Sequence, residues 1–345
     1  MSWRAYQLLF RLETPLHAGW RRVGNYWQCR PYLPAYPLLC ALAARLTESG
    51  YRFGGGHADP YYNTLEWLGK HVRFTYFFPA LAGGALPNLT VYLPCYREDG
   101  SLAFRRQEQV FGAGAAAQSS YSECPAAEFD YLFMDAQART ALSYPGRTAL
   151  AGALYHFEFL RSYTRPIDGA SSKPVYLTGY LFFDGEAAAE LRRDDKPDPR
   201  HLCALFDRLQ VGGERRLGWG LLRLANKSEV TGSAALFGLP GVELDLAGSV
   251  GVKVAVQPGA GDPAPVLAHT IPPPEKKPRL TGPVEVMLRR ETRFNGEGRR
   301  LSGMRVVLYG AESDPDKPRP LFFPGSRLKE RCEFAITPEG LWRPN

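Results

Sequence analysis

The sequence predicts an α+β fold from three observations: period-two alternation in the strand candidates, helical propensity between them, and a glycine-rich connection before the last strand. Six segments carry the prediction: a strand at 3–12, a helix at 38–46, strands at 154–160 and 175–183, a helix at 199–209 and a strand at 221–224. Their order, β–α–β–β–α–β, is that of the split βαβ or ferredoxin-like arrangement.

The first strand and the first helix have the clearest signals. Tyr6, Leu8 and Phe10 recur at every second position, which places them on one face of a strand. Pro15 cannot donate a hydrogen bond to a strand ladder, so the strand is expected to end before it. Pro37 suits the first turn of a helix and marks the start of the helical segment that follows.

The chain is expected to have two parts. Residues 1–230 carry the β–α–β–β–α–β domain, with a large insertion at about 51–152 where the pattern is irregular and rich in glycine. Residues 231–345 are expected to form a smaller β-rich C-terminal domain, which contains a proline- and glycine-rich stretch at 258–278. Whether this domain is a degenerate second copy of the first stays open.

The composition indicates a globular, basic protein. A chain of 345 residues can bury one large or two moderate cores, and a hydrophobic content of 45% excludes wholesale disorder. The net charge of +7 and the pI of about 9.1 are compatible with a nucleic-acid partner. The six cysteines include no C-x-x-C pair, and neither a signal peptide nor a membrane-spanning apolar run is present. A cytoplasmic protein with no membrane partner is therefore expected.

The most informative stretch is the glycine-rich loop within residues 209–224. Glycine leaves backbone amides bare, so such a loop can press N–H groups against an anion, and Arg215 and Arg216 add planar donor forks suited to phosphate. Neither the mononucleotide P-loop nor the dinucleotide-binding signature is present, which favours an extended phosphodiester. The alternative is a tight connection with solvated arginines. The expected contact residues are Gly212, Gly213, Arg215, Arg216, Gly218, Trp219 and Gly220.

Two further clusters are candidates for binding RNA. Basic and aromatic residues at 20–34 can pair with phosphates and stack on bases, or can pack under a loop with a basic rim. Arginines at 289–300 either grip RNA or a partner subunit, or form a solvated face. The residues selected from these clusters are Arg21, Arg22, Tyr26, Trp27, Arg30, Arg289 and Arg290.

Catalytic and metal-binding patterns are sparse. Metal-independent RNA cleavage needs a general base for the 2′-hydroxyl, and His17 and Asp168 are the candidates. A hydrogen-bonded turn histidine and a turn-capping carboxylate are the alternatives, so no catalytic residue is assigned. No histidine has a partner at metal-ligand spacing, and no metal or cofactor is expected.

Three of these segments resemble motifs of the RAMP superfamily of CRISPR-associated proteins, which are built on RRM-like or ferredoxin-like domains. The turn Thr-Pro-Leu-His-Ala-Gly at 14–19 is similar to the turn after the family's first strand. Residues 32–43 are similar to the family's entry into the first helix, although Ala35 and Cys40 stand where the family has glycines. Residues 212–220 resemble the family's glycine-rich loop, and residues 147–155 a stretch leading into a middle strand.

Within the superfamily the chain looks most like the Cas-five group of a type III-D-like or type VII effector complex. The resemblance implies a non-catalytic subunit that binds the crRNA 5′ handle in RNA-guided antiviral defence against foreign nucleic acid. It also implies a ribonucleoprotein complex in which the subunit contacts a Cas-seven-group backbone subunit and caps the backbone, meeting target RNA only indirectly. The alternative is a metal-independent RAMP endoribonuclease that processes precursor crRNA with His17 or Asp168.

Overall fold

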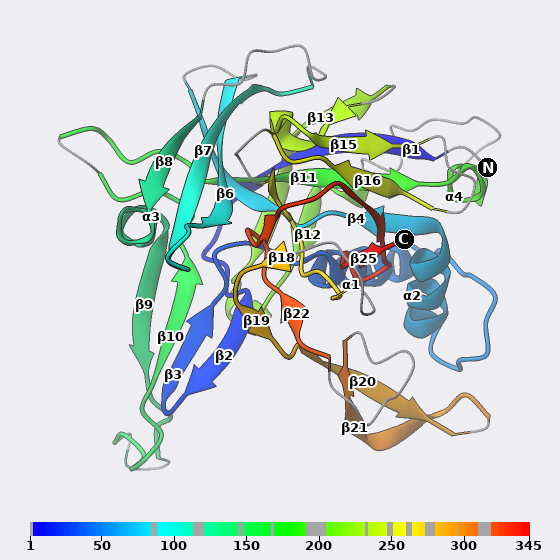
Figure 1. The fold of residues 1–345 in the computed structure, drawn as a ribbon. Helices are drawn as coiled ribbons and strands as arrows, with labels where there is room; N and C mark the ends of the chain where they lie inside the picture. Colours follow the sequence, from blue (N-terminus) through cyan, green and yellow to red (C-terminus); the bar gives the residue numbers. More distant parts are fainter. Residues whose placement is uncertain are drawn as a thin grey trace.

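The structure is a computed structural model of mixed α+β type, rich in strands and with few helices among the described residues (Figure 1). It describes residues 3–83, 88–112, 121–143, 146, 148–166, 169–190, 205–231, 234–246, 251–259, 264–272, 280–295, 297–309 and 319–345. None of the helices in these ranges has the length and apolar character that a membrane crossing needs.

The main sheet contains nine described strands, and β1 is an interior strand, third from one edge. β1 pairs antiparallel with β11 on one side and with β13 on the other, and β4 and β5 both pair with β11. The order from edge to edge is β12-β13-β1-β11-β5-β6-β7-β8. The strands are β1 Arg4–Leu12, β4 Val72–Phe74, β5 Phe78–Ala82, β6 Asn88–Tyr96, β7 Leu102–Val110, β8 Tyr121–Pro125, β11 Tyr176–Phe183, β12 Arg208–Gln210 and β13 Leu221–Val230.

Both faces of β1 are buried, although its sequence predicts one apolar face. Leu8, Leu9 and Phe10 are all inaccessible to solvent. Helix α1 packs against strands β4 and β12, and Phe237, which follows β13, packs edge-on against Phe78 and Tyr180. Because elements on each side remove apolar area from water, β1 is a central strand of one continuous core that also includes C-terminal residues.

Four described helices accompany the strands. α1 begins directly after Pro34, and its buried leucines recur at helical spacing, so one side of the helix faces the core. α2 has Asp59 as its N-cap, whose side chain accepts from the backbone N–H of Tyr61 at 3.0 Å, and Pro60 at its first turn. The helices are α1 Ala35–Glu48, α2 Pro60–His71, α3 Ala126–Phe133 and α4 Gly185–Glu190.

Two sequence-based assignments are wrong. The expected strand at 154–160 exists as β10 but pairs with β3 and β9 in a separate sheet, and β4 and β5 from the expected insertion take the place beside β11. The half-exposed side chains of β10 suit a strand with one solvated face, whereas β4 and β5 are largely buried. The expected helix at 199–209 does not reach its end, because β12 pairs there with β13; residues 191–204 lie outside the described ranges.

A second, four-stranded sheet has the order β2-β3-β10-β9. Its strands are β2 Gly19–Val23, β3 Tyr26–Cys29, β9 Met134–Arg139 and β10 Tyr155–Leu160. β2 and β3 form a hairpin directly after the turn at 14–19, so this sheet lies beside the end of β1 (Figure 1).

The described residues after 231 form strands and one 3-10 helix, η2 Leu236–Gly238. The largest sheet here has the order β14-β15-β16-β24-β25, and a separate two-stranded ribbon consists of β20 and β21. The strands are β14 Ala234–Ala235, β15 Val242–Asp245, β16 Lys253–Val256, β17 Ala264–Pro265, β18 Leu280–Thr281, β19 Val284–Glu285, β20 Leu288–Phe294, β21 Arg300–Leu308, β22 Leu321–Phe322, β23 Arg327–Leu328, β24 Cys332–Ile336 and β25 Trp342–Pro344.

Candidate nucleic-acid interface

The glycine loop, residues 211–220, is fastened to the proline turn, residues 14–19, although about two hundred residues separate them. The N–H of Gly220 donates to the carbonyl oxygen of Pro15 at 2.8 Å, and the N–H of Gly213 donates to that of His17 at 3.0 Å. The hydroxyl of Thr14 donates to the carbonyl of Gly218 at 2.8 Å and accepts from the N–H of Leu221 at 3.0 Å. The two segments therefore form one structural unit.

Close backbone approach explains two of the glycines. At Gly220 the φ angle is +72°, and a Cβ atom would lie 1.8 Å from the carbonyl oxygen of Val211. At Gly212 the φ angle is +79°, and a Cβ would lie 2.5 Å from the carbonyl oxygen of His17. Only glycine combines positive φ with this lack of space.

The expected bare amides are largely engaged within the protein. Gly213 and Gly220 donate to the proline turn, and the N–H of Gly218 donates to the carbonyl of Arg215 at 3.0 Å. The expectation that these three amides cradle an anion is therefore wrong. Arg215 and Arg216, on the 3-10 helix η1 Arg215–Leu217, are exposed, so their side chains can contact phosphates.

Trp219 packs onto the second sheet instead of standing free in solvent. Its ring lies edge-on to Phe159 at 4.8 Å and to Phe157 at 5.3 Å, and the guanidinium of Arg139 lies 4.7 Å from its centre. Arg139 also forms an ion pair with Glu214 at 2.9 Å. These contacts fix the glycine loop on the face of the sheet to which Phe157 belongs.

The same face of the sheet continues to Trp27. Trp27 is the register partner of Phe157 on β10 and of Arg22 on β2, so the three side chains share a face. The guanidinium of Arg22 lies 5.4 Å from the Trp27 ring centre, and Trp27 stays 40% exposed. An exposed indole beside a cation, next to a loop with two exposed arginines, is suited to stacking on a base and contacting the adjoining phosphates.

Arg21 and Tyr26 lie differently. Arg21 is exposed, donates to Gln28, and places its guanidinium 4.3 Å from the ring of Trp20. Tyr26 is partly buried, and its hydroxyl donates to the carboxylate of Glu158 at 3.3 Å. Among the described residues, no carboxylate forms an ion pair with Arg21, Arg22, Arg215 or Arg216.

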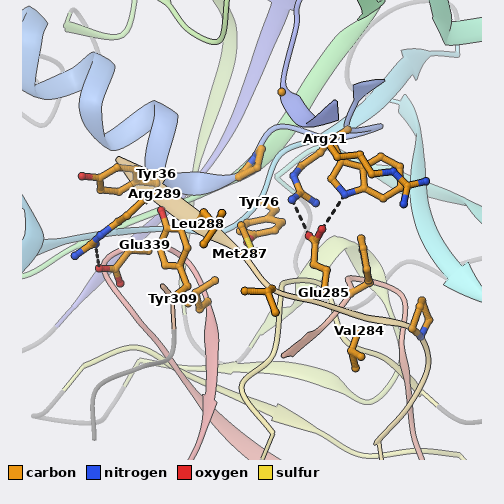
Figure 2. Close-up of a pocket in the computed structure, with 18 of the residues that line it drawn as sticks. Arg21, Tyr36, Tyr76, Val284, Glu285, Met287, Leu288, Arg289, Tyr309 and Glu339 are labelled. Atoms are coloured by element: carbon orange, nitrogen blue, oxygen red, sulfur yellow. Dashed lines mark hydrogen bonds and ion pairs between the residues drawn. The ribbon is translucent and has the colours of Figure 1, made fainter. Parts of the chain in front are cut away.

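Arg30 does not belong to an exposed surface, which corrects the expectation from sequence. Only 6% of it is accessible, and its guanidinium forms an ion pair with Glu285 at 2.7 Å. Glu285 also accepts from the indole N–H of Trp20 at 2.8 Å and contacts Nε2 of His269 at 2.7 Å. Nδ1 of His269 lies 2.8 Å from the hydroxyl of Tyr76. This buried cluster joins the N-terminal sheets to the C-terminal strands. Figure 2 shows Glu285 and Tyr76 of the cluster.

The charges of the cluster follow from its contacts. Burial lowers the pKa of His269 to about 4, so the imidazole is neutral at pH 7. Burial alone would raise the pKa of Glu285, but the hydrogen bond from His269 and the charge of Arg30 outweigh it and lower the pKa to about 2. Nε2–H of His269 then donates to the carboxylate, and Nδ1 accepts from Tyr76. Sequence reasoning missed His269 and Glu285, because neither has a motif or a nearby partner along the chain.

Arg289 is also engaged. It pairs with Glu339 at 2.8 Å and lies between the rings of Tyr36 and Tyr309, at 5.7 and 5.5 Å from their centres. These residues line a cavity of about 1020 Å³ together with Trp20, Arg30, Tyr76 and Glu285 of the cluster (Figure 2). Arg290 lies in β20, but its side chain is outside the described part.

His17 has the environment of a structural residue. Nδ1 donates to the carbonyl oxygen of Glu158 at 2.7 Å, and the ring packs on Phe157 with centroids 3.9 Å apart. Burial beneath the glycine loop lowers the pKa of the imidazole. Asp168 lies outside the described residues. Within the described part, no group of three or more histidine, cysteine, aspartate or glutamate residues could hold a metal ion.

No protein-family model matches the sequence, and no curated protein matches it. The structure is similar to chains of the type III-B Cmr-beta complex, a CRISPR effector. A chain from its cryo-EM structure with cognate target RNA and AMPPnP has 11% identity and a TM-score of 0.45, covering 94% of this chain and 85% of that chain. One from the structure with cognate target RNA has 10% identity and a TM-score of 0.42, covering 93% and 86%. One from the apo state has 9% identity and a TM-score of 0.35, covering 64% and 96%.

Proposed function

We propose that this protein is the subunit of a CRISPR effector complex that binds the 5′ handle of the crRNA. The observation that carries the proposal is the joining of two motifs. The proline turn and the glycine loop, each similar to a RAMP motif, are bonded to each other through backbone groups of Pro15, His17, Gly213 and Gly220. Motifs that function together are expected to meet in space.

The RNA surface that we propose consists of Arg22, Trp27, Arg215 and Arg216. Arg22 and Trp27 lie on one face of the β2-β3-β10-β9 sheet, and Arg215 and Arg216 are exposed on the glycine loop, which Trp219 fixes to that face. The three arginines have no carboxylate ion-pair partner among the described residues. Single-stranded RNA is bound by surfaces that combine exposed aromatic rings with unpaired cations, because bases stack on the rings and phosphates are attracted to the cations. Arg21 extends the positive charge to the other side of the β2–β3 hairpin.

The domain assignment is part of the proposal. In the strand order β13-β1-β11-β5, each neighbouring pair is antiparallel, as in a β–α–β–β–α–β domain whose second strand is formed by β4 and β5. We assign residues 1–230 to this RRM-like domain and residues 231–345 to a β-rich C-terminal domain. In the effector complex, this protein would contact a Cas-seven-group backbone subunit. The complex would act in the cytoplasm.

The test is fluorescence anisotropy of a labelled repeat-derived 5′ handle over a salt series. Trp27→Ala should weaken binding by about 1–3 kcal/mol, because one base loses its stacking partner. Arg215→Ala/Arg216→Ala should lower the log–log salt slope by about 0.7 for each lost phosphate contact. Arg331→Ala, which removes an exposed arginine paired with Glu333 on the C-terminal sheet, is the control and should leave the curve unchanged.

Two outcomes would contradict the proposal. One is equal affinity of the wild-type protein for the handle and for a scrambled RNA of the same length. The other is a set of variants that all bind like Arg331→Ala, since the RNA would then contact another surface. A handle preference that depends on Trp27 and on the two loop arginines supports both the function and its location.

A further inference from the structure

The ribbon, β20 and β21, is a two-stranded sheet that stands apart from the other sheets (Figure 1). Among the described residues no third strand pairs with either edge, and an isolated pair of strands is marginally stable by itself. The ribbon is held on the protein by Thr292, which bonds to the hydroxyl of Tyr62 at 2.6 Å, by Phe294, which packs on His57 at 4.3 Å, and by Arg289, which pairs with Glu339 at 2.8 Å. Within the described part of the chain, the outer edges of the ribbon have no strand partner and can accept an added strand.

An apolar strip leads into this ribbon. We define it as Val284, Val286, Leu288 and Val306, which are 48%, 47%, 60% and 62% exposed. The first three alternate along the chain and so share one side of an extended segment. Leu288 pairs with Leu308, and Val306 lies two positions from that partner, which puts it on the same face.

Positive charge lies at the end of the ribbon away from the strip, where Phe294 pairs with Arg300. Arg293, Arg299 and Arg300 on the ribbon are exposed. Glu297 approaches Arg299 only at 3.6 Å, with both side chains largely in solvent. A partner segment that runs from the strip along the ribbon would therefore be favoured by carboxylates at the end that reaches these arginines.

We propose that the apolar strip and the open edges of the ribbon dock an extended apolar segment of a neighbouring protein subunit, with carboxylates at the end of the segment that reaches Arg293, Arg299 and Arg300. Main-chain hydrogen bonds to an open edge supply affinity, and alternate apolar side chains supply the register. The identity of the partner as a subunit of the same effector complex rests on the function proposed above.

A protein segment fits this surface better than RNA does. RNA bases are recognised by stacking on aromatic rings, and the strip is entirely aliphatic. The aromatic residue of the ribbon, Phe294, is turned toward His57 and Tyr62 instead. Apolar residues with arginine beside them are typical of the centre of a protein–protein interface.

The experiment compares Leu288→Arg and Val306→Arg with the wild type, each co-expressed with the backbone subunit of its effector. Val110→Arg, at an exposed apolar position on β7 outside the strip, is the matched control. Each strip variant should weaken the partner Kd at least about tenfold, because an arginine replaces an aliphatic contact at the interface. The affinity for the 5′ handle, measured on the same preparations, should stay within about twofold. Amide hydrogens at 288–294 or 300–308 should exchange more slowly in the complex than in the free subunit.

The outcomes separate the alternatives. If the strip variants lost affinity for the 5′ handle but kept their affinity for the partner subunit, the strip would be assigned to RNA and the proposal would be overturned. Partner binding that changes no more than in Val110→Arg, or unchanged amide exchange in the ribbon, would also overturn it. A wild-type protein that binds the partner through the strip but shows no handle preference would refute the proposed function and leave the docking surface in place.

Discussion

Removing the charge of Glu285 tests how much the buried cluster between the N-terminal sheets and the C-terminal strands contributes to stability. In Glu285→Gln, Arg30 keeps its charge at 6% exposure and loses its counter-ion. The lowering of the Glu285 pKa, from an ordinary 4.5 to about 2, corresponds to roughly 3 kcal/mol at most. Removing one partner of a buried pair costs about 3–5 kcal/mol, and the amide oxygen of glutamine retains one acceptor. We therefore expect Glu285→Gln to lower the free energy of unfolding by about 3 kcal/mol, near the lower end of that range.

The loss should depend on pH with a definite sign. The pKa of Glu285 is lower in the folded state, so its stabilisation is complete above about pH 4.5 and is lost as the pH falls toward 2. The difference between wild type and Glu285→Gln should therefore be full at pH 7 and shrink to about 2 kcal/mol at pH 3.5. The buried, neutral His269 weakens both proteins as the pH falls from about 6.5 to 4, and Glu285→Gln at least as much, because Glu285 raises the pKa of His269.

Urea unfolding followed by tryptophan fluorescence at pH 7 and pH 3.5 measures this difference. Glu98→Gln is the control, because Glu98 pairs with Arg327 at 3.3 Å but is 91% exposed. Such a surface pair contributes about 0–1 kcal/mol. If Glu285→Gln were no less stable than Glu98→Gln, or if its deficit stayed constant with pH, the reasoning about the cluster would be wrong.

The remaining predictions concern the glycine loop, His17 and one thiol. Gly220→Ala should lose about 3 kcal/mol or more in thermal unfolding because its Cβ meets the backbone of Val211, whereas Gly218→Ala, with open space at the same sign of φ, should lose only about 1–2 kcal/mol. His17→Ala should lose about 2–3 kcal/mol through its hydrogen bond and ring contact, and should not alter the products of a metal-free incubation with precursor RNA; products that disappear in the variant would favour the ribonuclease alternative. Cys29, whose pKa burial raises to about 12, should resist alkylation at pH 8 until the protein unfolds, as peptide mass mapping can check.

The sequence predicted those features whose signals are local. The first strand, the first helix and the glycine-rich connection are all present, because alternation, a proline at a helix start and glycine at tight turns act over a few residues. The expectation that the loop glycines leave bare amides for an anion is partly wrong. Its glycines serve the close backbone contacts of Gly212 and Gly220 rather than leaving amides bare.

The features that the sequence could not predict depend on distant pairing. Nothing local distinguishes β10, which joins β3 in parallel, from β5, which joins β11. Likewise, Arg30 and Trp27 lie in the same arginine-rich stretch, but Arg30 is buried against Glu285 and Trp27 stays exposed. Glu285 lies more than two hundred residues later, so nothing local predicts this difference.

The interior position of β1 has a consequence during synthesis on the ribosome. Its two neighbours, β11 and β13, begin at Tyr176 and Leu221, so β1 is made long before the strands that pair with it. At about 5–20 residues per second, translation reaches these strands roughly 10–40 s after β1 is made. During this interval Leu8, Leu9 and Phe10 lack the sheet that later buries them. The segment that contains β1 is therefore expected to need a chaperone until β13 has emerged.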